Sequence, residues 1–130
     1  MPHLQFELNF TPSTEEKRAF GAAVVRAFST VMDTGTDHIA VTLRCYGPDD
    51  LVFGRAAGGR TIFANADLRN GRTKEQKRRL ALQFLADAEK ILGVPQTAGY
   101  VIYTEHDGQD FQLSDRVLPS WSAGEDPLRD

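Results

Sequence analysis

Two halves of the sequence carry the same order of patterns, and this internal repeat limits the folds that the chain can adopt. Each half has a strand pattern, then an amphipathic helix pattern, then a second strand pattern. A shift of 59 positions superimposes the halves, so that Phe6 falls on Asn65 and Thr14 falls on Thr73. A duplicated strand–helix–strand unit predicts an α+β fold, with one four-stranded mixed sheet covered on one face by two helices.

The first half is defined by strand-like alternation on either side of a helix signal. Apolar and polar residues alternate strictly from Leu4 to Phe10, which is typical of a half-buried strand. Ser13 and Glu16 have the spacing of a capping box, which marks the start of a helix. The elements predicted here are a helix from about Thr14 to Met32 and strands at Leu4 to Phe10, His38 to Tyr46 and, as a short edge piece, Leu51 to Phe53.

The second half repeats these signals. Thr73 and Gln76 have capping-box spacing, and Gly93 follows the last apolar residue of the helix pattern, where a helix commonly ends. The predicted elements are strands at Arg60 to Leu68 and Gly99 to Thr104, the helix ending before Gly93, and a turn at Asp107 to Asp110. We expect a single domain over 1–130, with pseudo-repeats at about 2–58 and 59–115 and a tail at about 116–130.

Composition excludes several classes of protein and site. The net charge of −3 gives no indication of binding to nucleic acid or to an acidic membrane surface. A single cysteine, Cys45, rules out an internal disulfide framework. His3, His38 and His106 do not have metal-ligand spacing with it, so we expect structural or solvated histidines and no metal or cofactor. With no long apolar segment and no signal-like start, a cytoplasmic protein is expected.

Pro2 is the residue whose position most suggests chemistry. A small residue in second place commonly allows removal of the initiator methionine, so the mature chain is expected to begin with the secondary amine of Pro2. This amine would be fixed to the end of a strand. The alternative is that Pro2 is simply a common second residue, at one of the few strand positions that tolerate proline.

Four further motifs, in order and spacing, resemble those of the tautomerase superfamily, most closely its cis-3-chloroacrylic acid dehalogenase-like members. They are Gly58-Gly59-Arg60-Thr61-Ile62-Phe63, Leu68-Arg69-Asn70-Gly71-Arg72, Val101-Ile102-Tyr103 and Val117-Leu118-Pro119. The resemblance implies a homotrimer with a site near each Pro2, completed by neighbouring subunits. A second copy would also hide the sheet face that two helices leave uncovered.

Particular residues match the functional positions of those dehalogenases. Pro2 matches the catalytic proline, Arg69 and Arg72 match the paired arginines that hold a substrate carboxylate, and Tyr103 matches a tyrosine that assists catalysis. Two positions depart from the pattern. Phe28 and Ser29 stand where those enzymes have a histidine, and Leu113, with Gln112 and Asp115 nearby, stands where they have the water-activating glutamate.

These residues together favour proton transfer on a small carboxylate substrate. Two guanidinium charges and partial burial would lower the pKa of the Pro2 amine, so that it is a neutral base near pH 7. Arginine forks bind carboxylates, so Arg69 and Arg72 would hold a 2-oxo acid and stabilise its enolate. The alternative for both arginines is a solvated turn, and for Tyr103 it is a core position.

Three functions remain open from the sequence. The first is a cofactor-independent isomerase that interconverts keto and enol forms of a small 2-oxo acid. The second is a hydratase or dehalogenase of 3-substituted acrylates, in which Asp110 or Asp115 would replace the missing glutamate. The third is a non-catalytic trimeric binding protein. Three further groups of residues have other expected roles. Arg55 and Arg60 flank the glycine loop and could approach a site, and the basic run Lys74, Lys77, Arg78 and Arg79 is expected to be a solvated helix face. Trp121 is expected to cap an apolar surface or to line a pocket.

Overall fold

The computed structural model of the protein describes residues 1–128; positions 129–130 of the predicted tail lie outside the described residues. The helices and strands are β1 (His3–Leu8), α1 (Thr14–Met32), β2 (Ala40–Cys45), β3 (Ile62–Arg69), α2 (Lys74–Leu92) and β4 (Gly99–His106). Three short 3-10 helices connect them: η1 (Gly54–Ala56), η2 (Gln96–Ala98) and η3 (Gly108–Asp110).

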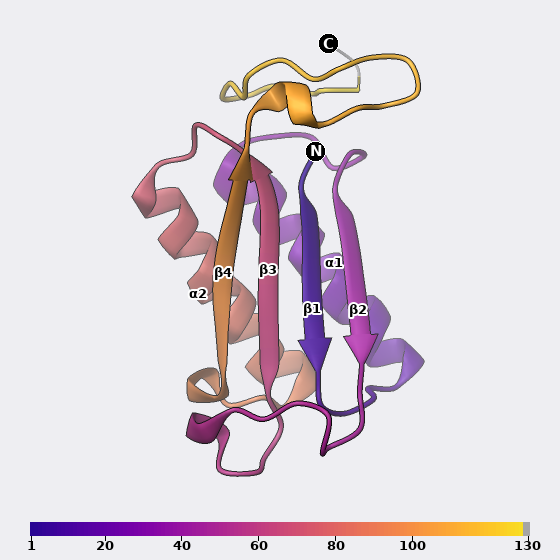
Figure 1. Cartoon of the computed structure of the whole chain (residues 1–130), viewed down its shortest axis with the longest axis vertical. Coiled ribbons are helices and arrows are strands. Elements are labelled where there is room, and N and C mark those ends of the chain that lie inside the picture. The colour runs from indigo at the N-terminus through magenta and orange to yellow at the C-terminus, as the bar shows by residue number, and fades with distance from the viewer. Residues whose placement is uncertain (129–130) are drawn as a thin grey trace.

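The strands form one mixed sheet in the order β2-β1-β3-β4. β1 pairs parallel with β2 and β3 pairs parallel with β4, while β1 and β3 run antiparallel at the centre. Both helices lie on the same face of the sheet (Figure 1). The predicted α+β architecture is therefore confirmed.

The offset between the two halves is 60 residues, so the predicted shift of 59 is wrong by one. α1 begins at Thr14 and α2 at Lys74, and the helix N-caps are Ser13 and Thr73. Phe6 is buried on the helix side of β1, whereas Asn65, its predicted equivalent, alternates with the buried residues of β3. A slip of one residue moves every strand side chain to the opposite face, so only the larger offset superimposes the two core faces.

Both helices begin at a complete capping box, as predicted. The Ser13 hydroxyl accepts from the Glu16 amide at 3.1 Å, and the Glu16 carboxylate accepts from the Ser13 amide at 2.9 Å. The α2 box is built in the same way by Thr73 and Gln76. α2 ends at Leu92 and is capped by Gly93, whose φ of 69° is left-handed and suits a residue without a side chain.

Replacing Ser13 with alanine is expected to lower the free energy of unfolding by about 1 kcal/mol, because the Glu16 amide at the start of α1 loses its side-chain acceptor. Urea denaturation measures this loss at a fixed protein concentration. Thr14→Ala is the matched control, since Thr14 is exposed and begins the helix without capping it. Equal stability of the two variants would contradict the role of the cap.

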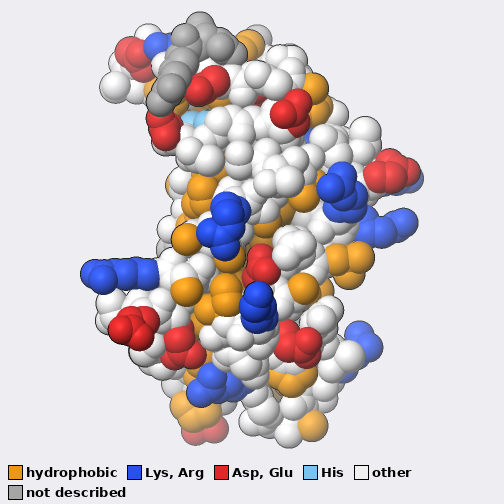
Figure 2. All heavy atoms as spheres, turned by 180° about the vertical axis from the view of Figure 1, so that it is seen from behind, with side chains coloured by type: hydrophobic (Ala, Val, Ile, Leu, Met, Phe, Trp, Pro, Cys, Tyr) orange, Lys and Arg blue, Asp and Glu red, His pale blue; other side chains and the backbone are white. Residues whose placement is uncertain are grey.

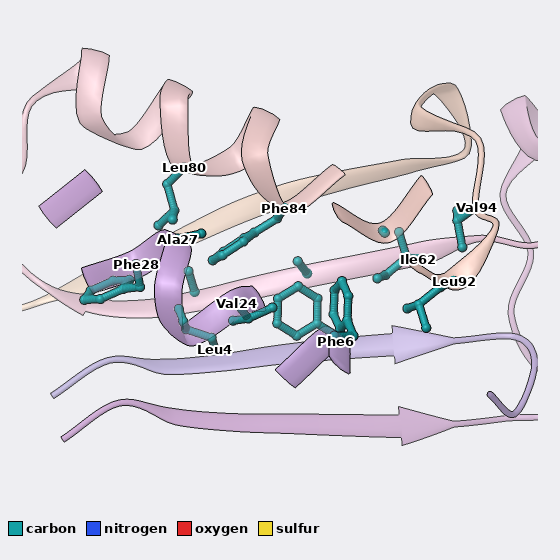
Figure 3. Close-up of a cluster of buried hydrophobic side chains, with 14 of the residues drawn as sticks. Leu4, Phe6, Val24, Ala27, Phe28, Ile62, Leu80, Phe84, Leu92 and Val94 are labelled. Atoms are coloured by element: carbon teal, nitrogen blue, oxygen red, sulfur yellow. The ribbon is translucent and has the colours of Figure 1, made fainter. Parts of the chain in front are cut away.

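The core lies between the sheet and the two helices (Figure 3). Phe6 sits at its centre and makes edge-to-face contacts with Phe20 of α1 at 5.0 Å and with Phe84 of α2 at 5.3 Å. One β1 side chain thus joins both helices to the sheet. This packing holds β1, and with it the N-terminus, in a fixed position relative to the two helices.

The two outer surfaces differ in character. Basic and acidic side chains are interspersed over the helix face (Figure 2), where Lys74, Arg78 and Arg79 are exposed as predicted and Lys77 pairs with Glu105 at 2.9 Å. The sheet face without helices leaves Tyr100 and Ile102 47% and 56% exposed.

One predicted strand is absent from the described chain. Leu51 to Phe53 leads into η1 without pairing, and Phe53 packs its ring against Phe63 at 5.4 Å and against Tyr100 at 5.9 Å. After η3, a single bridge between Gln112 and Val117 is formed. Neither long helix within residues 1–128 has the length and hydropathy of a bilayer-crossing segment. Within the same residues, no three His, Cys, Asp or Glu side chains converge as metal ligands.

Candidate active site

The N-terminus opens into a pocket of about 330 Å³ at the end of the sheet. Its walls come from residues 1–3, from His38 and Ala40 at the start of β2, and from residues 111–113 after η3. The C-terminal segment crosses the molecule at this same end (Figure 1). Pro2 is itself buried, as the alternation along β1 requires.

The N-terminal amine at this pocket has an unusually low pKa. In the full-length chain the amine belongs to Met1, and burial, followed by the charges of Arg69 and Arg72, lowers its pKa from 8.0 to about 5. Both causes act against the cation. They come from the surroundings of the chain end and not from methionine, so the local environment favours a neutral amine at pH 7.

Arg69 ends β3 and is 1% exposed. One of its terminal nitrogens donates to the Pro119 carbonyl at 2.8 Å. The other donates to the carboxylate of Glu125 in a buried ion pair. Arg69 thus holds a carboxylate, as the sequence predicts for a ligand, but this carboxylate is internal.

Arg72 lies just before α2 and is 7% exposed. Its Nη1 donates to the Arg69 carbonyl at 2.8 Å, and its guanidinium lies 4.7 Å from the ring centre of Trp121. Burial, then the charge of Arg69, lowers the pKa of Arg72 to about 10, which leaves it cationic at neutral pH. Trp121 therefore covers a guanidinium of its own chain; the sequence predicted an apolar surface.

Residues 119–126 cover both arginines, and hydrogen bonds attach them to the end of α1. The Glu125 carbonyl accepts from the Thr34 hydroxyl at 3.1 Å, and the Gly124 amide donates to the Asp33 carbonyl at 2.9 Å. Arg69 and Arg72 consequently do not line the pocket beside Pro2. They act on the amine through their charge.

His38 and Glu125 are the two residues of this region that sequence reasoning missed. His38, predicted to be structural or solvated, is 3% exposed and lines the pocket. Its place at the start of a predicted strand was a usable signal, because that strand, β2, pairs with β1 at the chain start. Glu125 had none, because it lies in a loop without periodicity.

Tyr103 is placed differently from the other predicted site residues. Its ring packs against the core on the helix side of β4, and its hydroxyl donates to the Lys77 carbonyl of α2. Burial raises its pKa, so the phenol stays protonated. Within one chain the structure therefore gathers Pro2, Arg69 and Arg72, while the Tyr103 hydroxyl is engaged by α2.

The remaining candidates lie outside the site or are exposed. Arg60 donates to the Leu92 carbonyl at 2.8 Å, and the glycine loop with Arg55 lies at the end of the sheet opposite to the N-terminus (Figure 1). Asp110 is exposed, and the Asp115 side chain is 62% exposed in a surface pair with Arg116. Neither aspartate is placed to activate a water in the pocket.

The departures from the dehalogenase pattern have structural roles of their own. Phe28 is buried, with its ring 5.8 Å from the Arg72 guanidinium, and the Ser29 hydroxyl donates to the Thr34 carbonyl at 2.6 Å. Leu113 forms part of the pocket wall. These three residues shape the site without adding a titratable group to it.

Comparison with solved structures identifies the same fold in several proteins, although no protein-family model and no curated protein matches the chain. Macrophage migration inhibitory factor from Toxoplasma gondii is 17% identical, with 89% of this chain and 99% of that chain covered at a TM-score of 0.78. FG41 malonate semialdehyde decarboxylase, inhibited by 3-bromopropiolate, is 22% identical, with 85% of this chain and 88% of that chain covered at a TM-score of 0.74. A fused 4-OT solved as a symmetric trimer is 20% identical, with 89% of this chain and 94% of that chain covered at a TM-score of 0.80.

Proposed function

We propose, from the tautomerase-superfamily fold that this chain adopts, that it is a cofactor-independent tautomerase of small 2-oxo acids. The observation that carries the proposal is the place of the N-terminal amine, which lies at a pocket and close to two buried arginines, whose charges together with burial lower its pKa. Removal of Met1 gives the amine to Pro2. A neutral amine on a rigid strand end is suited to act as general base and then as general acid.

In the proposed reaction the amine of Pro2 takes a proton from the carbon beside the keto group and returns it to the other end of the enolate. The charge of Arg72 stabilises the negative oxygen that develops. The substrate carboxylate takes the position that Glu125 holds on Arg69, which requires residues 119–126 to move off the arginines. The internal ion pair supports this assignment, because it places a carboxylate on the same guanidinium.

The role predicted for Tyr103 stays a prediction, because its hydroxyl is used by Lys77 in the described chain. The hydratase or dehalogenase alternative is not favoured, since Asp110 and Asp115 are exposed and away from the pocket lining. The exposed Tyr100 and Ile102 support a homotrimer that covers the free sheet face. Light scattering after size-exclusion chromatography tests this assembly, and a monomer would contradict it.

Intact mass and a pH profile test the proposed function. We expect a protein that lacks Met1 and that ketonises the enol of phenylpyruvate, followed by ultraviolet absorbance. Because the base must be unprotonated, kcat/KM rises with pH through the pKa of the amine and is level at neutral pH. The surroundings that lower the Met1 amine pKa to about 5 place this rise well below the ordinary value near 8.

Three results would contradict this proposal. A retained Met1 would make the nitrogen of Pro2 an amide and leave it without a basic lone pair. A protein that lacks Met1, binds phenylpyruvate and does not turn it over would instead be the non-catalytic binding protein considered above. An acid limb near pH 8 would show that the amine is not held in its neutral form.

A further inference from the structure

His38 is fixed beside the first residues of the chain by the pairing of β1 with β2. The parallel register sets His3 against Ala40, and the Ala40 amide donates to the Pro2 carbonyl at 3.2 Å. His38 lies two residues ahead of β2, Met1 and Pro2 lie just ahead of β1, and all three residues line the same pocket. Removing Met1 would therefore leave the new chain end in the pocket that the imidazole lines.

Hydrogen bonds around Thr34 determine which imidazole nitrogen carries the proton. The Thr34 hydroxyl has one hydrogen, and it donates to the Glu125 carbonyl at 3.1 Å, an oxygen that can only accept. Thr34 Oγ1 must then accept from His38 Nε2, which lies 3.3 Å away. In the neutral ring the proton is on Nε2, so Nδ1 is a bare acceptor.

This acceptor is buried and has no hydrogen-bond partner among residues 1–128. A buried acceptor without a partner is costly, so a nearby donor is expected to complete it. The charged groups that act on the ring are the N-terminal amine on β1, Arg69 on β3, Arg72 before α2, and Asp126 in the C-terminal segment.

The ring is neutral at the pH of interest. Burial, then the N-terminal amine and the charge of Arg69, lowers the pKa of His38 from 6.5 to about 4, against an opposing contribution from Asp126. A neutral histidine with a free Nδ1 does not compete with the amine for a proton near pH 7. The Nδ1 atom of this ring offers only a lone pair, which can accept a hydrogen bond.

We propose that His38 is a positioning residue for the Pro2 amine, and that its Nδ1 accepts one N–H of that amine. This inference rests on the proposed function, for which it supplies the orientation of the base. A neutral secondary amine has one N–H and one lone pair, so fixing the N–H directs the lone pair toward the pocket. When the amine is protonated, the first N–H stays on His38 and the second carries the proton that moves to and from the substrate. His38 itself exchanges no proton.

Two substitutions separate the nitrogens of the ring. His38→Asn puts an amide oxygen near the position of Nδ1, whereas His38→Gln reaches the position of Nε2 and leaves that of Nδ1 empty. We expect His38→Gln to lower kcat about 30-fold with KM changed less than about 2-fold, because the base is misdirected and substrate contacts are kept. His38→Asn should retain kcat within about 3-fold of the parent. Equal losses in both variants would overturn the proposal, because a packing role does not distinguish the two nitrogens.

A titration of the amine tests His38 without relying on turnover. In protein labelled with 15N-proline, only one of the six prolines carries a titrating nitrogen once Met1 is removed, and that is Pro2. Loss of a neutral acceptor disfavours the cation, so the Pro2 titration should move about one pH unit lower in His38→Gln and stay in place in His38→Asn. An unchanged titration in His38→Gln would overturn the proposal. A shifted titration in a protein that does not turn over phenylpyruvate would refute the tautomerase function alone.

Discussion

Replacing Pro2 with alanine is expected to lower kcat/KM for phenylpyruvate ketonisation by about 10²-fold or more. General acid–base groups contribute about 10²–10⁴-fold, and the new N-terminal amine would lack the ring that fixes its direction. A primary amine remains at the chain end, so the loss comes from geometry and basicity and not from removal of nitrogen. Steady-state rates over a pH series, together with the intact mass of each variant, provide the measurement.

Gln5→Ala is the matched control for this experiment. Gln5 also lies on β1 but is not part of the pocket wall, and its amide donates to the Asp67 carboxylate at 2.6 Å. We expect the rate of this variant to stay within about 3-fold of the parent, because the change leaves the charges around the amine in place. A Pro2→Ala variant as active as Gln5→Ala would contradict the assignment of the base.

Breaking the Arg69–Glu125 pair is expected to cause the largest loss of stability at the site. Both side chains are buried, so Arg69→Met or Glu125→Gln leaves one charge without its partner. We expect each single change to lower the free energy of unfolding by about 3 kcal/mol. This is the lower end of the range for buried pairs, because release of the C-terminal segment can hydrate the remaining charge. Urea denaturation at one protein concentration gives the values, since assembly makes stability concentration-dependent.

A double substitution and a surface pair control the interpretation. Arg69→Met combined with Glu125→Gln removes both charges and should lose less than the two single changes together. Asp115→Asn breaks the exposed pair with Arg116 and should cost about 0.5 kcal/mol or less. Additive losses at Arg69 and Glu125 would show that the two residues are not coupled in solution.

The same pair has a consequence for substrate binding. If a substrate carboxylate replaces Glu125 on Arg69, Glu125→Gln weakens the internal competitor, and KM for phenylpyruvate should fall about 5-fold or more. Trp121 stacks on Arg72 and is the only tryptophan, so its fluorescence reports displacement of the C-terminal segment independently of turnover. An unchanged KM would mean that the carboxylate binds elsewhere.

Much of the fold could be predicted because its signals are local. Alternation along β1 and the capping boxes at Ser13 and Thr73 depend on residues within a few positions of one another. The helix from Thr14 to Met32 is observed with the predicted bounds. The offset between the repeats is not a local property, because it depends on which side chains of the paired strands β1 and β3 face the helices. Matching Thr14 with Thr73 in the sequence gave an offset of 59 instead of 60.

For the site, local patterns were enough to place a proline after Met1 at the start of an alternating strand, and Arg69 and Arg72 at a turn before a capped helix. The surroundings of these residues depend on contacts between distant parts of the chain. Glu125 is 56 positions from Arg69 in the chain, and it lies in a loop whose pattern predicts no partner. His38 acquires its bare nitrogen only because Thr34, the C-terminal segment and the parallel pairing of β1 with β2 meet at one point. The sequence thus proposes Pro2 as a candidate base, whereas the contacts that surround its amine arise only in the folded chain, because they join segments that are distant in the sequence.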